Sequence, residues 1–99
     1  MISEEILPNS VIVHIDRFSI SKDLQLEALE EFKELCLSSG TSVCAEVSGK
    51  VDRPTPNFFI KQGKLDEINQ LVKTFKANLV IFNNDLTPSQ ERNLEKYLG

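Results

Sequence analysis

Short apolar runs alternate with amphipathic stretches along this chain, and this alternation limits the possible folds more than any other feature. The runs have the length of strands and lie at residues 11–15, 43–47 and 79–82. Stretches with helical apolar spacing follow them at residues 21–39, 63–78 and 87–98. The order βαβαβα predicts a three-layer α/β sandwich with a short parallel sheet, and right-handed crossovers predict the strand order 2-1-3.

The first two apolar runs are expected to differ in burial. Residues 11–15 are almost uniformly apolar, which is typical of a strand covered on both faces of a parallel sheet. In the second run Val43, Ala45 and Val47 alternate with less apolar side chains, so this strand is expected to lie at a sheet edge. The periodicity then disappears from residue 48 to residue 62, which predicts a long loop.

Local signals predict where the three helices begin. Ser21 is a suitable N-cap for the first helix, and Gly63 opens the second. Thr87, Pro88 and Gln90 supply a capping box with the favoured first-turn proline for the third. The residues expected to face the core are Leu24, Ala28, Leu29, Phe32, Leu35 and Cys36 in the first helix, Leu65, Ile68, Leu71, Val72 and Phe75 in the second, and Leu94, Tyr97 and Leu98 in the third.

Length and composition exclude several classes of protein. Ninety-nine residues suffice for one domain, and 40% hydrophobic with 26% charged residues is ordinary for a soluble folded domain. No stretch approaches the roughly 20 apolar residues of a membrane-spanning helix, and the first eight residues lack the basic start of a secretory signal. Cys36 and Cys44 are too few for a disulfide scaffold and are expected to be inert thiols. These features predict a cytoplasmic domain.

Charge is distributed unevenly along the chain. The net charge of −4 argues against a general affinity for nucleic acid or anionic lipid. The first helix carries a run of acidic side chains that is expected to form its solvated face: Glu27, Glu30, Glu31 and Glu34. Residues 48–64 are different, because four cations there oppose the single Asp52, which makes this segment +3 and leaves −7 for the rest of the chain.

The basic segment also contains aromatic residues. Phe58 and Phe59 lie among its cations, and surfaces that bind RNA combine lysine or arginine for phosphates with aromatic rings for bases. The predicted contact residues for RNA are Lys50, Arg53, Phe58, Lys61 and Lys64. The alternative interpretation is that residues 48–64 form an ordinary solvated loop that binds no RNA.

Gly63 and Lys64 at the start of a helix invite comparison with the phosphate-binding P-loop. The Walker A pattern needs a glycine five residues before Gly63 and a serine or threonine after Lys64. Phe58 and Leu65 occupy those places, so the flexible cradle and the magnesium-binding hydroxyl are both missing. We therefore expect no nucleotide site here.

A second candidate site lies where strands are expected to end. Asp16 follows the first strand, and Asn83 and Asp85 follow the third; ligands of open parallel sheets gather at the carboxyl ends of strands. These residues define an alternative metal or phosphate site, like that of a receiver domain, although Asp and Asn are also ordinary turn formers. His14 is the only histidine and is expected to be structural.

Two segments of the chain resemble the N-terminal domain of HflX-family GTPases. They are residues 53–68, RPTPNFFIKQGKLDEI, and residues 79–96, LVIFNNDLTPSQERNLEK. With the flanking residues the resemblance spans nearly the whole chain, so residues 1–99 are interpreted as one HflX-like N-terminal α/β domain. Lys61 departs from the family, which usually has glycine there and a tight turn.

The resemblance implies a cytoplasmic protein that binds the large ribosomal subunit, through its rRNA, and splits or rescues stalled ribosomes. It implies a GTPase in the full-length family protein, with GTP and Mg in a G domain that these residues do not include. This fragment is accordingly expected to hold no cofactor and not to be an enzyme. Its own GTPase domain is a further expected partner. Relatives continue beyond the position of Gly99 into another strand and a helical hairpin, so the chain looks like an excised domain.

The third predicted strand suggests one more partner. If a following strand normally pairs beside residues 79–82, the chain without it leaves an open edge with unpaired backbone groups. Such an edge recruits other strands. A modest tendency to form a homodimer through Leu79–Phe82 is therefore expected.

Overall fold

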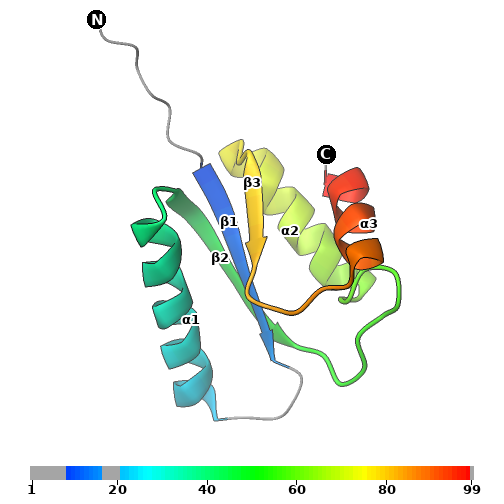
Figure 1. The fold of residues 1–99 in the computed structure, drawn as a ribbon, viewed down its shortest axis with the longest axis horizontal. Helices are drawn as coiled ribbons and strands as arrows, with labels where there is room; N and C mark the ends of the chain where they lie inside the picture. Colours follow the sequence, from blue (N-terminus) through cyan, green and yellow to red (C-terminus); the bar gives the residue numbers. More distant parts are fainter. Residues whose placement is uncertain (1–8, 17–20, 99) are drawn as a thin grey trace, which may run out of the picture.

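The computed structural model describes residues 9–16 and 21–98, and its elements follow the predicted order (Figure 1). They are β1 (Asn9–Asp16), α1 (Lys22–Ser38), β2 (Ser42–Lys50), α2 (Gln62–Phe75), β3 (Leu79–Phe82) and α3 (Pro88–Leu98). The three strands form one parallel sheet in the order β2-β1-β3. The predicted βαβαβα sandwich and its strand order 2-1-3 are confirmed.

The central strand β1 determines the register of the sheet. It pairs with β2 from Asn9↔Ser42 to Asp16↔Lys50, with one irregularity between Ser10 and Val11, and with β3 over four residues. Its residues 10–15 are all buried, as expected for a strand covered on both faces. Since β2 pairs with β1 as far as Lys50, it is longer than the predicted strand of residues 43–47. The loop between β2 and α2 therefore covers residues 51–61, not the predicted 48–62.

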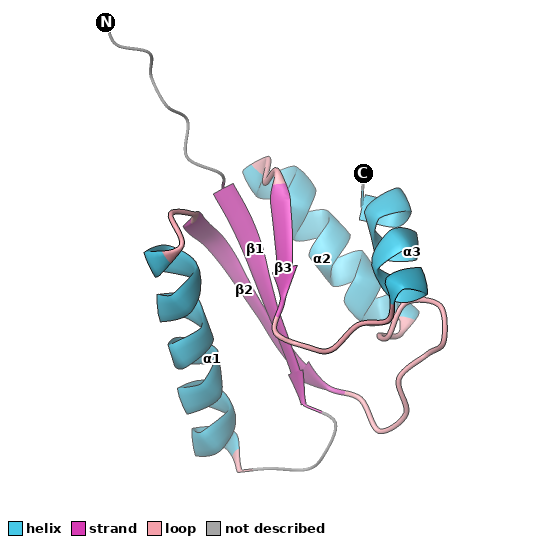
Figure 2. Cartoon of the chain, in the orientation of Figure 1, coloured by secondary structure: helices cyan, strands magenta, loops and turns pink. Residues whose placement is uncertain are grey.

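Helices cover the two faces of the sheet unequally. Figure 2 shows α1 alone on one side, with α2 and α3 side by side on the other. Two separate hydrophobic clusters form the core. The cluster on the α1 side consists of Ile12, Leu29, Phe32 and Cys36. The cluster on the α2 and α3 side consists of Val11, Val13, Ile15, Val47, Val51, Phe59, Ile60, Leu65, Ile68 and Leu94.

Four residues predicted to face the core are exposed instead. In α1, Leu24 is 56% exposed and Leu35 is 68% exposed; Phe75 at the end of α2 and Tyr97 in α3 are also exposed. A helix buries only the stripe that touches its neighbours, and a sheet of three strands is narrow. The apolar stripes predicted for the helices were therefore wider than the sheet and neighbouring helices that could bury them.

The predicted capping residues act as expected. The Leu24 amide donates to Ser21 Oγ at 3.2 Å. At α3 the Thr87 amide donates to Gln90 Oε1 at 2.9 Å, and the Gln90 amide donates to Thr87 Oγ1 at 3.1 Å, which completes the capping box. Among the described residues, no helix is long and apolar enough to cross a membrane.

Both cysteines are free thiols in different surroundings. Cys36 belongs to the α1-side cluster and is buried, and this burial raises the pKa of its thiol. Cys44 is half-buried on β2, where its Sγ donates to the Ser10 carbonyl at 3.2 Å.

Candidate functional site

The loop between β2 and α2 is held in one conformation by its own hydrogen bonds. Thr55 and Phe59 form an isolated antiparallel bridge, with both backbone bonds at 3.0–3.1 Å. The Thr55 hydroxyl accepts from the Phe58 amide and donates to the Ile60 carbonyl, both at 3.2 Å. Because these hydrogen bonds close the turn within residues 55–60, the loop has a defined conformation of its own.

Two side chains of α3 anchor this loop from outside. Gln90, which is buried, donates through Nε2 to the Thr55 carbonyl at 2.9 Å. Asn93 donates to the Asn57 carbonyl, also at 2.9 Å. Gln90 therefore serves the capping box with its oxygen and the loop with its nitrogen, which couples the start of α3 to the shape of the loop.

The two phenylalanines of the loop have different environments. Phe59 is 4% exposed and belongs to the core, although its φ of 70° is one that residues other than glycine rarely adopt. Phe58 is half-buried and meets the Tyr97 ring edge-on, with 5.8 Å between the ring centroids. One ring thus supports the loop from inside, and the other packs at the surface against α3.

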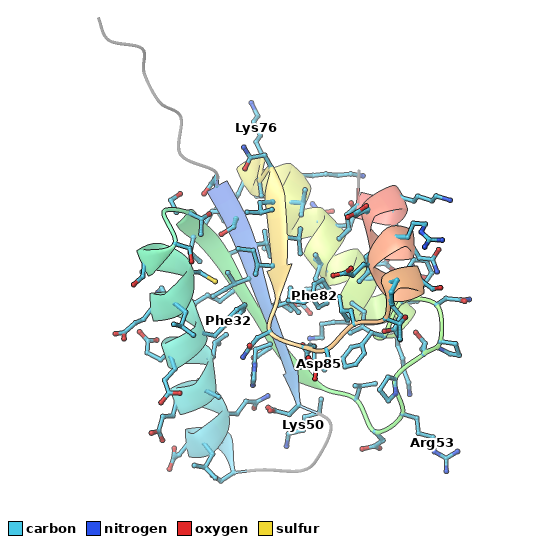
Figure 3. The ribbon with its side chains drawn as sticks, viewed as in Figure 1. Phe32, Lys50, Arg53, Lys76, Phe82 and Asp85 are labelled. Atoms are coloured by element: carbon cyan, nitrogen blue, oxygen red, sulfur yellow. The ribbon has the colours of Figure 1, made fainter. Side chains whose placement is uncertain are left out.

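Three of the predicted cations are exposed around this loop. Lys50 ends β2, Arg53 lies in the loop, and Lys61 is the N-cap of α2. Within the part of the chain that the structure describes, none of the three side chains has an ion pair or a hydrogen bond. Lys50 and Arg53 point outward at the same end of the molecule, and Lys76 lies at the opposite end (Figure 3).

The fourth predicted cation, Lys64, has structural partners. Its ammonium donates to the Ser48 carbonyl at 3.0 Å and to the Glu67 carboxylate at 2.9 Å. Its side chain lies over Gly49, where an added Cβ would come within 3.0 Å of Lys64 Cε. Lys64 therefore ties the first turn of α2 to the end of β2, and it is less available to a partner than Lys50, Arg53 and Lys61.

Lys61 stands where the sequence resemblance predicts a glycine and a tight turn. Its φ of −85° and ψ of 167° are ordinary extended values, so the backbone here does not require glycine. The substitution adds an exposed positive charge at the N-terminus of α2 without strain.

The alternative site at the carboxyl ends of the strands centres on His14. The Asn83 side chain donates through Nδ2 to His14 Nδ1 at 3.0 Å, and with that nitrogen accepting, the ring proton is on Nε2, which donates to Asp16 Oδ1 at 3.1 Å. Asp85 is exposed and lines a recess of about 630 Å³ with Phe59, Phe82, Asn83 and Asn84. Two of the three predicted residues, Asp16 and Asn83, are thus joined through the histidine.

This arrangement is a poor match for a hard cation. Asp16 accepts a hydrogen bond from His14 on Oδ1, and its Oδ2 is buried without a partner among the described residues, so this carboxylate has only one oxygen left for an ion. No group of three or more His, Cys, Asp or Glu side chains in residues 9–16 and 21–98 could hold a metal ion. With Phe58 and Leu65 at the two discriminating positions of the Walker A pattern, these residues do not fit Mg-GTP either.

Asn84 is an important residue that the sequence interpretation missed. Its side-chain oxygen accepts from the Ile15 amide at 3.2 Å, and its nitrogen donates to the Ile15 carbonyl at 2.7 Å. The amide thereby continues the pairing of β1 with β3 beyond the last residue of β3. Asn is so common in turns that its type and position alone do not reveal this role.

Comparisons with known proteins give concordant results. A family model described as "GTP-binding GTPase N-terminal" matches residues 26–99. The chain is 38% identical over 87 residues to GTPase HflX of Escherichia coli K12, which covers 88% of this chain and 20% of that protein. It is 47% identical over 68 residues to GTPase HflX of Thermococcus kodakarensis, covering 69% and 15%. The chain spans about a fifth of the length of the curated relatives it matches.

Proposed function

Because this chain belongs to the HflX family of GTPases, in which it corresponds to the N-terminal domain, we propose that it is a ribosome-binding module. The module associates with the large ribosomal subunit in the cytoplasm, and the intact protein splits or rescues stalled ribosomes. In the intact protein, a GTPase domain outside these residues hydrolyses GTP with Mg. That domain also contacts the module.

The observation that carries this proposal is the anchored basic loop. Lys50, Arg53 and Lys61 are exposed and unpaired among the described residues, and Gln90 and Asn93 hold the backbone between them. A cation that no intramolecular carboxylate neutralises is available for an RNA phosphate. A loop that is already ordered loses little conformational entropy on binding.

The distribution of charge favours one orientation toward rRNA. The segment of residues 48–64 is +3, and the remainder of the chain is −7. RNA therefore attracts the loop end of the molecule and repels the rest, which orients the domain before contact is made. Phe58 adds a partly exposed ring beside the cations, whereas Lys64 keeps its partners Ser48 and Glu67.

The test is binding of the 99-residue chain to purified large ribosomal subunits at several salt concentrations. If three phosphates are contacted, the logarithm of the association constant should fall with the logarithm of salt concentration with a slope of about −2 to −3. The double variant Arg53→Glu with Lys61→Glu should weaken binding strongly and flatten this slope.

A matched control carries the same change of charge at the other end of the molecule. Lys76 and Lys96 are exposed near the C-terminal ends of α2 and α3, and Lys76→Glu with Lys96→Glu should leave binding nearly unchanged. Equal losses in both double variants would mean that only net charge matters. Unchanged binding in the loop variant would remove the loop from the proposal.

In the part of the chain that the structure describes, β3 is an edge strand of the sheet, and this edge supports a second, weaker proposal, that of a homodimer. A groove of about 680 Å³ runs along Leu79–Phe82 between the strand and α3, with Leu94 and Leu98 among its lining residues. We propose that a second copy of the chain pairs modestly with this edge, since unpaired strand edges template other strands. Sedimentation velocity over a range of concentrations tests it: Leu79→Lys should reduce any dimer, and a monomer at every concentration contradicts it.

A further inference from the structure

Helix α1 has two flanks that differ in what lies beside them. It packs on the sheet through Leu29, Phe32 and Cys36, and Figure 3 shows Phe32 directed from the helix toward the strands. On one flank Lys33 reaches Glu46 of β2 at 3.4 Å. Since β2 and β3 lie on opposite sides of β1, the other flank of α1 faces the β3 side of the sheet.

The β3-side flank is apolar and exposed. Leu24, Ala28 and Leu35 share it, because spacings of four and seven residues return to nearly the same side of a helix. Leu35 lies about 200° around the helix from Lys33, and both leucines are more than half exposed. On the same face of the sheet β3 presents Leu79, which is 41% exposed, and Ile81, which packs on the α1-side cluster. Among residues 9–16 and 21–98, two helices cover the opposite face of the sheet and one covers this face.

Carboxylates border this apolar flank on its solvent side. Glu27 and Glu31 are exposed and one turn apart, three residues after Leu24 and Ala28 respectively. Acidic residues at this border repel RNA and anionic lipid, and they repel the same flank of a second copy. A partner that covers the leucines and pairs with both glutamates must be apolar along one stripe and basic beside it.

We propose that the flank formed by Leu24, Ala28, Leu35, Glu27 and Glu31 docks a basic amphipathic helix of a protein of the large ribosomal subunit. The inference rests on the proposed function and names a second contact for it. The stripe of the incoming helix covers the leucines beside β3, and its lysines or arginines pair with Glu27 and Glu31. Proteins that lie against rRNA are rich in such cations because they neutralise phosphates. The domain would then contact RNA with its basic loop and protein with its acidic helix.

The first experiment uses a peptide of known composition. A synthetic helix with leucine at every third or fourth position and lysine elsewhere is titrated into the isotope-labelled 99-residue chain, and amide chemical shifts are followed by NMR. The largest shifts should map to Leu24, Ala28 and Leu35 and to the start of β3. The same peptide with glutamate in place of lysine should not bind. Shifts spread over the acidic surface without this focus would overturn the proposal.

The sequence offers a closely matched pair of variants. Leu24→Gln with Leu35→Gln changes the β3-side flank, and glutamine keeps helix propensity. Leu26→Gln with Leu37→Gln makes the same change two residues later, on the β2-side flank, at leucines that are 53% and 48% exposed. Losing two leucine contacts should weaken peptide binding roughly tenfold or more in the first variant, and less than about twofold in the second. Equal losses would overturn the assignment to one flank.

The same variants decide whether the ribosome supplies the helix. Leu24→Gln with Leu35→Gln should weaken binding to large subunits, and the control should not. Unchanged subunit binding by this variant overturns the ribosomal partner but leaves the loop-based function intact. If the wild-type chain binds no subunits, the proposed function fails and the ribosomal partner fails with it, whatever the peptide result. A dimer of the wild-type chain that Leu24→Gln with Leu35→Gln abolishes would assign the flank to a second copy and overturn the proposal.

Discussion

The two faces of the sheet are built from similar residues, yet they are buried to very different extents. On one face α2, α3 and the 51–61 loop close over β1 and β2, and Ile68 and Leu65 become almost completely inaccessible. On the other face α1 covers a narrow cluster around Ile12, and four of its leucines stay exposed. The first face is therefore the main source of stability, and the second leaves apolar surface exposed.

The residues proposed to contact partners follow the same division. The loop that presents Arg53 and Lys61 belongs to the heavily packed face, since its own Val51, Phe59 and Ile60 are core residues. The glutamates and exposed leucines belong to the lightly packed face. A rigid loop suits contacts with phosphates in a defined arrangement, whereas an uncovered helix flank suits a partner that completes the layer.

The largest effect is expected from a cavity on the heavily packed face. Ile68→Ala removes three carbons from a side chain that is 0% exposed, so we expect the free energy of unfolding to fall by about 4 kcal/mol. Chemical denaturation measures this loss. A loss below about 1 kcal/mol would mean that this face is less tightly packed than its burial indicates.

A smaller loss is expected at the matching position of α1. Leu29→Ala changes a residue that is 8% exposed in the smaller cluster, and we expect a loss of about 2 kcal/mol because the surroundings are more open to relaxation and water. Measured under identical denaturation conditions, a loss equal to or larger than that of Ile68→Ala would reverse the comparison of the two faces.

Removing the capping box of α3 should lower the free energy of unfolding by about 1 kcal/mol. Thr87→Ala removes the hydroxyl that accepts from the Gln90 backbone amide, and it thereby loosens the first turn of α3, from which the Gln90 side chain holds the loop through Thr55. We therefore expect lower stability and faster amide hydrogen exchange near Thr55. Ser89→Ala, one residue beyond Pro88 and exposed, is the control and should change neither. Unaltered exchange near Thr55 in Thr87→Ala would separate the cap from the loop.

The smallest effect concerns the two thiols. Cys36 should react with iodoacetamide more slowly than Cys44, because burial raises its pKa and hides the sulfur. The folded state then holds this proton to a higher pH than the unfolded state does, so its contribution to stability is complete below the pKa of the unfolded thiol and declines as pH rises above it. Cys36→Ala should remove that decline, and faster reaction at Cys36 would contradict the assignment.

Residues that act on near neighbours in the chain were predictable. Ser21, Thr87 and Gln90 cap helices through bonds that span three residues, so their types and spacing were sufficient. The alternation of Val43, Ala45 and Val47 correctly indicated an edge strand. By contrast, the exposure of Leu24 and Leu35 depends on the width of the sheet beneath α1, which local periodicity does not contain.

Partners far apart in the chain were the part of the candidate site that could not be predicted. Asn84 pairs with Ile15 across 69 residues, and His14 joins Asp16 to Asn83. Lys64 was grouped with the other cations by charge, but the end of β2 happens to place the Ser48 carbonyl within its reach. Nothing in the composition of residues 48–64 distinguishes this lysine from Lys50 or Lys61.

By itself the sequence determined the order of elements, the parallel sheet, the N-terminal caps of α1 and α3 and the +3 segment on a −7 remainder, because periodicity, capping and charge are properties of short stretches. The tertiary structure alone decided which cations are exposed, which phenylalanine supports the loop, and which flank of α1 is uncovered. Those outcomes depend on packing between elements distant in the chain, where the position of a neighbouring strand or helix determines whether a side chain is buried, paired or exposed.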